Sequence, residues 1–252
     1  IAAEGIGRLE VMSGVRSRED SAAVRAGLAV GFAAAAYGVS YGALAVAAGL
    51  DVWQTCVMSL LMFTGGSQFA FIGVIATGGV AAGPTAIASA AILGIRNGIY
   101  GVRVAPIIGG PWWKKVAAAW VTIDETTAVS TNQPTKRSQR IGFWTTAAAT
   151  FVGWNLTSLV GALIGDALGD PRAWGLDAAA AAAFVGLLWP RLRQVQTIAV
   201  ASAAAVVAIV LTPVLLPGLP VLVAGVVAVV VGGFNWFANS EPPLVPLERE
   251  GA

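Results

Sequence analysis

The sequence predicts an all-α fold, a polytopic transmembrane helix bundle with about seven or eight spans, some of them discontinuous. Of the 252 residues, 57% are hydrophobic and only 11% are charged, whereas a soluble domain carries about a quarter charged residues. The mean hydropathy is +0.77. Because one span needs roughly 20 apolar residues, the chain has no room for a separate soluble domain.

The composition also excludes most enzyme chemistries. Histidine is absent and Cys56 is the single cysteine, which excludes histidine-based triads, histidine-bound haem, zinc sites and an intrachain disulfide. We therefore expect no metal, no cofactor and no enzymatic activity. The formal net charge is +2, and in a membrane protein a basic excess normally marks cytoplasmic loops, so we expect no nucleic-acid partner.

The chain divides into three parts. Residues 1–22 mix acidic and basic side chains without the apolar core of a signal peptide, and we expect a cytoplasmic tail there. Residues 23–238 form the transmembrane domain, and residues 239–252 form a loosely ordered, proline-containing tail. The expected spans of the domain cover residues 24–48, 53–77, 84–109, 115–131, 141–167, 174–189, 194–212 and 220–238.

Short basic segments orient these spans. The N-terminal tail and the loops at residues 136–140 and 191–193 carry lysine or arginine, and eight spans with both termini in the cytoplasm put all three on the inside. Lys114 and Lys115 then fall in an outer loop. Either they are an exception, or a neighbouring segment is re-entrant and the count is seven.

Small residues recur at helical spacing, which lets helix backbones approach closely. The first expected span has glycines at intervals of four, seven and four residues: Gly27, Gly31, Gly38 and Gly42. Similar sets are Gly161, Gly165 and Gly169, and Gly94 and Gly98. We interpret them as helix-packing positions and not as a substrate passage.

A polar break interrupts the second expected span. Residues 63–69 read F-T-G-G-S-Q-F, and the central residues are Gly65, Gly66, Ser67 and Gln68. Irregular backbone at membrane depth persists only where protein or a watery cavity surrounds it. A half-helix starting near Ser67 would point free N–H groups at an anion such as a substrate carboxylate. The alternative is an intact helix with a glycine packing notch.

Two arginines lie on one face of the third span, because Arg96 and Arg103 are seven residues apart. Arg103 is close to Pro106 and could reach the interface as an anchor. Arg96 is deeper, where arginine costs about 2.5–3.5 kcal/mol on insertion scales. We assign Arg96, with its neighbour Asn97, to the substrate site.

Three acids are candidates for transport. Asp124 and Glu125 are adjacent, so on a helix they diverge by about 100° and one should point inward. They are candidates for the proton-carrying group, an amine ligand or the partner of Arg96, unless the segment ends there and water solvates them. Asp177 opens the sixth segment, where capping is as good an explanation as transport.

These motifs resemble those of the AzlC family of branched-chain amino acid permeases. F-T-G-G-S-Q-F resembles the family's F-x-G-x-S-Q-F, and the segment at 96–106, R-N-G-I-Y-G-V-R-V-A-P, resembles its R-H-x-x-Y-G-x-x-x-A-P. D-E-T at 124–126 and G-L-D at 175–177 fall where the family has D-E and G-L-D. The sequence departs from the pattern at Asn97, where many relatives have histidine, and in the alanine run after Asp177.

The resemblance implies export of branched-chain or similar apolar amino acids across the bacterial inner membrane, driven by protons, with a small AzlD-like membrane subunit as partner. With no histidine, Asp124 or Glu125 is expected to carry the proton, because desolvation raises a carboxylic acid's pKa towards neutral. A passive channel for small neutral or anionic solutes is the alternative, since half-helices and an arginine also build pore filters. A non-transporting scaffold would not need them.

Overall fold

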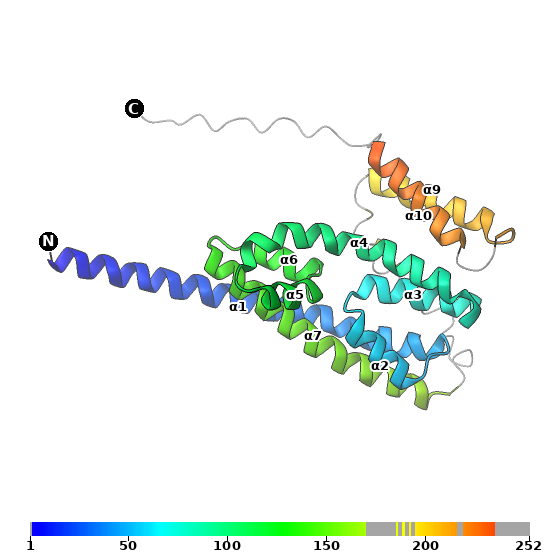
Figure 1. Cartoon of the computed structure of the whole chain (residues 1–252), viewed down its shortest axis with the longest axis horizontal. Helices are drawn as coiled ribbons and strands as arrows, with labels where there is room; N and C mark the ends of the chain where they lie inside the picture. Colours follow the sequence, from blue (N-terminus) through cyan, green and yellow to red (C-terminus); the bar gives the residue numbers. More distant parts are fainter. Residues whose placement is uncertain are drawn as a thin grey trace. The chain divides into compact units, whose positions relative to one another are not determined.

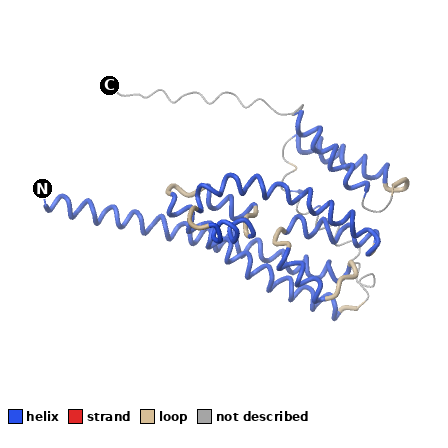
Figure 2. Tube along the Cα trace, in the orientation of Figure 1, coloured by secondary structure: helices blue, strands red, loops and turns tan. Residues whose placement is uncertain are grey.

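The computed structural model describes residues 2–169, 185, 188–189, 192, 195–215 and 219–234, and all regular structure in these ranges is helical (Figure 2). The chain forms two compact units, residues 1–184 and 185–252, which we describe separately. The first unit contains α1 (Ala2–Ala47), α2 (Val52–Leu61), α3 (Gly65–Gly78), η1 (Val80–Ala82), α4 (Gly83–Ile108), α5 (Trp112–Trp120), α6 (Asp124–Thr131) and α7 (Lys136–Ala167). The all-helical prediction is confirmed for these ranges.

Three helices of the first unit are long and apolar enough to cross a membrane. Their apolar parts run over Ser17–Ala47, Val80–Ile108 and Lys136–Ala167. At 1.5 Å per residue each exceeds the roughly 30 Å of a bilayer core. The helix α1 begins at Ala2, so the segment expected to be a polar tail continues the first helix.

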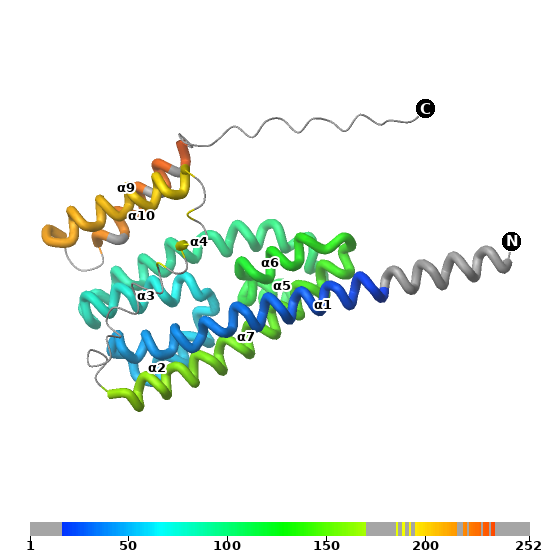
Figure 3. Tube along the Cα trace, turned by 180° about the vertical axis from the view of Figure 1, so that it is seen from behind, coloured from blue at the N-terminus to red at the C-terminus, as the bar shows by residue number. Residues whose placement is uncertain are grey.

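Helices α1 and α7 run side by side and in parallel (Figures 1 and 3). A Cβ added at Gly27 would be 3.0 Å from the Thr145 Cβ, and one at Gly42 would collide with the Ser158 carbonyl. On α7, a Cβ added at Gly161 would likewise collide with the Val39 carbonyl of α1. The predicted packing role is confirmed for the glycines between α1 and α7, namely Gly27, Gly31, Gly38, Gly42, Gly161 and Gly165. It is wrong for Gly98 and Gly169, because no atom of the described residues lies within 4 Å of a Cβ added at either position. Gly94 has only the Ser67 hydroxyl nearby, at 3.7 Å.

The second expected span, residues 53–77, is a helical hairpin. One apolar cluster joins the chain before α2, the end of α3 and η1, which directly precedes α4. Its members there are Leu50, Val74, Ile75 and Ala82. The hairpin α2–α3 therefore begins and ends at the same end of the unit. The predicted discontinuity is confirmed, and the alternative of an intact helix is wrong. The break lies at Met62–Thr64, so α3 already begins at Gly65 and not near Ser67, and the segment returns instead of crossing as one span.

The fourth expected span, residues 115–131, is a second hairpin, α5–α6. Arg140 Nε, on the first turns of α7, donates a 2.6 Å hydrogen bond to the Ile107 carbonyl in the last turn of α4. Ile108 also shares a buried cluster with Ala118 and Phe143. Since α4 ends where α7 begins, the hairpin between them also starts and finishes at one end, opposite to the open end of α2–α3.

This second hairpin explains why Lys114 and Lys115 disagree with the topology of eight spans. Lys114 and Lys115 open α5, at the same end as the basic start of α7, where Arg137 pairs with Asp20 of α1 at 2.9 Å. The re-entrant alternative therefore fits the arrangement of the first unit, and the outer-loop position that eight spans assign to these lysines does not.

The second unit contains α9 (Val195–Leu211) and α10 (Leu219–Phe234). They are antiparallel, with Gln196 Nε2 donating to the Val231 carbonyl at 3.0 Å. They correspond to the spans expected at 194–212 and 220–238. The expected span 174–189, Asp177, the basic pair at 191–193 and the tail at 239–252 lie largely or wholly outside the described residues.

Candidate functional site

The break between α2 and α3 is three residues long, Met62 to Thr64. Thr64 is the N-cap of α3 in an extended conformation, and its side chain makes no capping hydrogen bond. The first N–H groups of a helix have no acceptor within the helix. The amino end of α3 at Gly65, Gly66 and Ser67 therefore offers donors and a positive dipole end in the interior of the unit.

Gln68 holds this break together. Its side chain is fully buried, and its Nε2 donates to the Met62 carbonyl at 2.7 Å. Its Oε1 accepts a 2.9 Å hydrogen bond from Trp154 Nε1 of α7. The amide thus satisfies a carbonyl freed by the break and fastens the break to a long helix.

An arginine crosses the amino end of α3. Arg96 Nη1 of α4 is 3.1 Å from Asp124 Oδ2. Its Nη2 lies 2.7 Å from the position that a Cβ on Gly66 would take, so a larger residue there would displace the guanidinium. Arg96 Nε is buried without a hydrogen-bond partner among the described residues.

Asp124 opens α6, the second half-helix. The break before it is held by Thr126, fully buried, whose hydroxyl accepts a 2.9 Å hydrogen bond from the Ile123 N–H. The amino ends of α3 and α6, from hairpins that open at opposite ends of the unit, thus both reach Arg96. The side chains of Arg96 and Asp124 are 33% and 30% exposed, so the pair is accessible.

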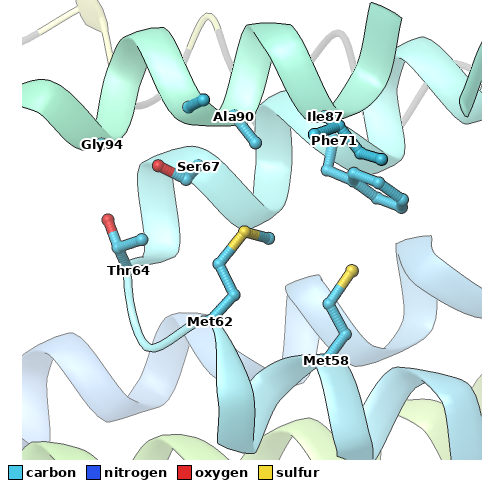
Figure 4. A pocket seen from close by; sticks show the side chains of 9 residues that line it. Met58, Met62, Thr64, Ser67, Phe71, Ile87, Ala90 and Gly94 are labelled. Atoms are coloured by element: carbon cyan, nitrogen blue, oxygen red, sulfur yellow. The ribbon is translucent and has the colours of Figure 1, made fainter. Parts of the chain in front are cut away.

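A cavity of about 400 Å³ adjoins the amino end of α3. Figure 4 shows Thr64 and Ser67 at one side of it and the apolar side chains of Met58 and Phe71 at the other. Ser67 is 1% exposed, and its hydroxyl has no hydrogen-bond partner among the described residues. The lining residues are Met58, Met62, Thr64, Ser67, Phe71, Ile87, Ala90, Ala91 and Gly94.

Comparison with known protein families decides the identity of the chain. The family model described as AzlC protein matches residues 29–168, which is more than half of the chain. The chain belongs to the AzlC family. No curated protein and no solved structure matches it. Because this family is associated with amino-acid transport, the chain is a membrane transport protein.

The AzlC match contains both hairpins, α4, α7 and the part of α1 from residue 29 onward, and it ends at the C-cap of α7. Within it, the structure brings Gly66, Ser67, Arg96 and Asp124 together. Glu125, beside Asp124, is half-buried.

Three other predicted residues lie differently. Asn97 is half-buried, and its Oδ1 has no hydrogen-bond partner within the part of the chain that the structure describes. Arg103 is exposed, as expected for an anchor at the interface. Asp177 lies outside the described residues.

Sequence reasoning missed the apolar wall of the cavity and Trp154. Met58, Met62 and Ile87 sit in apolar segments, where nothing distinguishes a cavity-lining side chain from a lipid-facing one. Trp154 carries a polar N–H in the middle of a long apolar helix, and buried tryptophan usually has a hydrogen-bond acceptor. That requirement was the available signal, but it does not name Gln68 as the acceptor.

Proposed function

We propose that this AzlC protein is a secondary transporter that exports branched-chain or similar small apolar amino acids across the bacterial inner membrane, coupled to protons. The observation that carries the proposal is the adjacency of a cation and a half-helix amino end to an apolar cavity. Arg96 lies against Gly66, and the next residue, Ser67, lines the cavity.

The carboxylate of an amino acid fits the polar side of this site. Guanidinium groups and helix amino ends both bind carboxylates. Ser67 adds a buried hydroxyl without a partner among the described residues, which supports a polar ligand group at this point, since buried polar groups are normally hydrogen-bonded.

The apolar side of the cavity suits a branched aliphatic side chain. Its volume of about 400 Å³ is at the small end of ligand pockets, which range over about 300–1,000 Å³. Met58 and Met62 form part of the wall. Because methionine is unbranched and adaptable, such a wall would accept several related aliphatic side chains.

Proton coupling is assigned to the acids at the start of α6. Asp124 reaches the site directly through Arg96, and Glu125 is next to it. With no histidine in the chain, a carboxylic acid is the ordinary group that titrates in a membrane cavity. Glu125 remains the slightly favoured carrier.

A passive channel for small neutral or anionic solutes is the second candidate. Two half-helices whose amino ends meet at an arginine also match the construction of selective pores. Counterflow separates the two functions, because a carrier exchanges labelled for unlabelled substrate and accumulates label transiently, whereas a channel only equilibrates it.

The test is counterflow of labelled leucine in proteoliposomes containing the full chain, with and without the small membrane subunit that we propose as its partner. We expect transient accumulation, and stimulation of net flux by a proton gradient. Arg96→Met should reduce exchange by about 10-fold or more, while the matched variant Arg103→Met keeps the wild-type rate. Absence of counterflow under both conditions would contradict the carrier.

The proposed setting is a multi-pass inner-membrane protein with both termini in the cytoplasm. The basic end of the first unit, with Lys114, Lys115 and the start of α7, supports a cytoplasmic position for that end. Affinity purification from membranes should recover the AzlD-like subunit in stoichiometric amount if it is a stable partner.

A further inference from the structure

Arg96 has one of its three nitrogens engaged by an acid of the protein itself. Nη1 pairs with Asp124, Nη2 lies against Gly66 at the amino end of α3, and Nε has no partner among the described residues. A guanidinium beside a helix amino end places two positive groups together, since that end carries about half an elementary charge. The Asp124 carboxylate is the anion that the structure shows beside them.

Hydrogen-bonding groups at the amino end of α3, beside this pair, have no partner among the described residues. Ser67, 1% exposed, lines the cavity, and no described residue hydrogen-bonds to its hydroxyl. A carboxylate bound at the first turn of α3 would meet the Ser67 hydroxyl, the free N–H groups and Arg96 together. It would then compete with Asp124 for the same guanidinium.

We infer that Asp124 is the internal occupant of the carboxylate site, exchanged for the substrate's carboxylate when the substrate binds. This inference rests on the proposed function. The exchange replaces one carboxylate on Arg96 by another, so the charge around the guanidinium is unchanged. It breaks the ion pair between α6 and α4 only when a carboxylate ligand is present.

The partial exposure of the Arg96–Asp124 pair makes this exchange feasible. Both side chains are about one-third exposed, and an incompletely buried ion pair contributes less to stability than a fully buried one. Breaking a fully buried pair would instead leave an uncompensated buried charge. A ligand carboxylate with additional donors on α3 can therefore displace Asp124.

The same residues permit one competing interpretation, in which Asp124 binds the substrate's ammonium group. The two interpretations predict opposite changes in leucine binding when Asp124 is neutralised. If Asp124 competes with the ligand, neutralising it strengthens binding. If Asp124 holds the ammonium, neutralising it weakens the binding of leucine but not of an analogue without the amine.

The experiment measures equilibrium binding to the purified full chain in nanodiscs with three probes: leucine, 4-methylpentanoate, which lacks the ammonium group, and 3-methylbutylamine, which lacks the carboxylate. In Asp124→Asn we expect leucine and 4-methylpentanoate to bind about 3- to 10-fold more tightly than in wild type. The amine should bind neither protein. Asp51→Asn, a change at the exposed N-cap of α2, is the matched control and should bind as wild type.

Asp124→Ser provides a second neutral variant, because serine is well tolerated at a helix amino end, and it should show the same increase. Weaker leucine binding with unchanged 4-methylpentanoate binding would overturn the inference in favour of the ammonium ligand, and unchanged affinity for both would remove Asp124 from the site.

If neither variant folds but the double variant Arg96→Met with Asp124→Asn does, the pair is structural and the inference is wrong. Failure of wild type to bind or exchange leucine would instead contradict the proposed function itself.

Discussion

Gly66 shows how one residue determines the geometry of the site. Any side chain there would enter the space of the Arg96 guanidinium, so the close approach of arginine to the α3 amino end requires glycine. Its neighbour Gly65 has an equivalent restriction, because the Trp154 ring lies 2.9 Å from the position that a Cβ on Gly65 would take. The glycine pair that the sequence presents as a flexible break is therefore also a docking surface for two large side chains.

Gly66→Ala should reduce leucine affinity by about 10-fold with little loss of stability. The added methyl group would be 2.7 Å from Arg96 Nη2, the mobile end of a long side chain, which can turn away from α3. Gly98→Ala, on α4 with no atom within 4 Å of the new Cβ, is the control. Leucine affinity is measured by binding to the purified chain. Equal affinities in the two variants would show that Gly66 is not part of the substrate site.

Gln68→Leu should lower stability more than it lowers affinity. The change leaves Trp154 Nε1 and the Met62 carbonyl without the partners they have now, and each unsatisfied buried group costs about 1–3 kcal/mol. Thermal unfolding of the purified chain should show a marked decrease in Tm, compared with a small one for Gln54→Leu at an exposed position. A normal Tm with abolished leucine binding would instead identify Gln68 as a direct ligand.

At the scale of elements, the parallel pair α1–α7 is the frame that supports both hairpins. Gly42 and Gly161 let the two backbones touch, and Thr157 Oγ1 of α7 donates a 2.6 Å hydrogen bond to the Ala35 carbonyl of α1. Tyr41 of α1 and Trp154 of α7 then stack, with ring centroids 6.1 Å apart. Close helix packing thus fixes the tryptophan that holds the break between α2 and α3.

Gly161→Ala should destabilise the protein by about 1–3 kcal/mol, the usual cost of overpacking. The new methyl group would collide with the Val39 carbonyl, which is backbone and cannot rotate away. Gly101→Ala, with open space around its Cβ, should be neutral or slightly stabilising, because alanine is the better helix former. Detergent-melting curves of the two variants and wild type measure the difference. Equal midpoints would show that α1 and α7 can move apart at this position.

At the scale of the whole molecule, the first unit combines three long helices with two hairpins that enter from opposite ends and meet at Arg96. This arrangement carries a topology that labelling can test. In a Cys56→Ala background, Lys114→Cys and Lys136→Cys should both react from the cytoplasmic side. Val80→Cys, 88% exposed at the other end, should react from outside. Labelling of Lys114→Cys and Lys136→Cys from opposite sides would show that the segment between them crosses the membrane as a continuous span and is not a hairpin.

The sequence by itself determined the class, the polar break and the candidate residues. Apolar composition excludes a soluble fold, Gly65 and Gly66 interrupt a hydrophobic run, and Arg96 is too costly in a membrane to lack a function or a partner. All these inferences depend on local properties, namely hydrophobicity, backbone freedom and charge. Each of these properties belongs to a single residue or to the segment around it, so the sequence is enough to identify it.

Only the tertiary structure decided whether each broken segment crosses or returns, and which acid meets the arginine. An apolar segment of about 25 residues has the same composition as one span or as two half-helices folded back, so hydropathy cannot separate them. The pairing of Arg96 with Asp124 joins residues 28 positions apart through the return of the second hairpin. It depends on where α5 and α6 pack against α4 and α7, because contacts between distant residues follow from packing and not from local sequence.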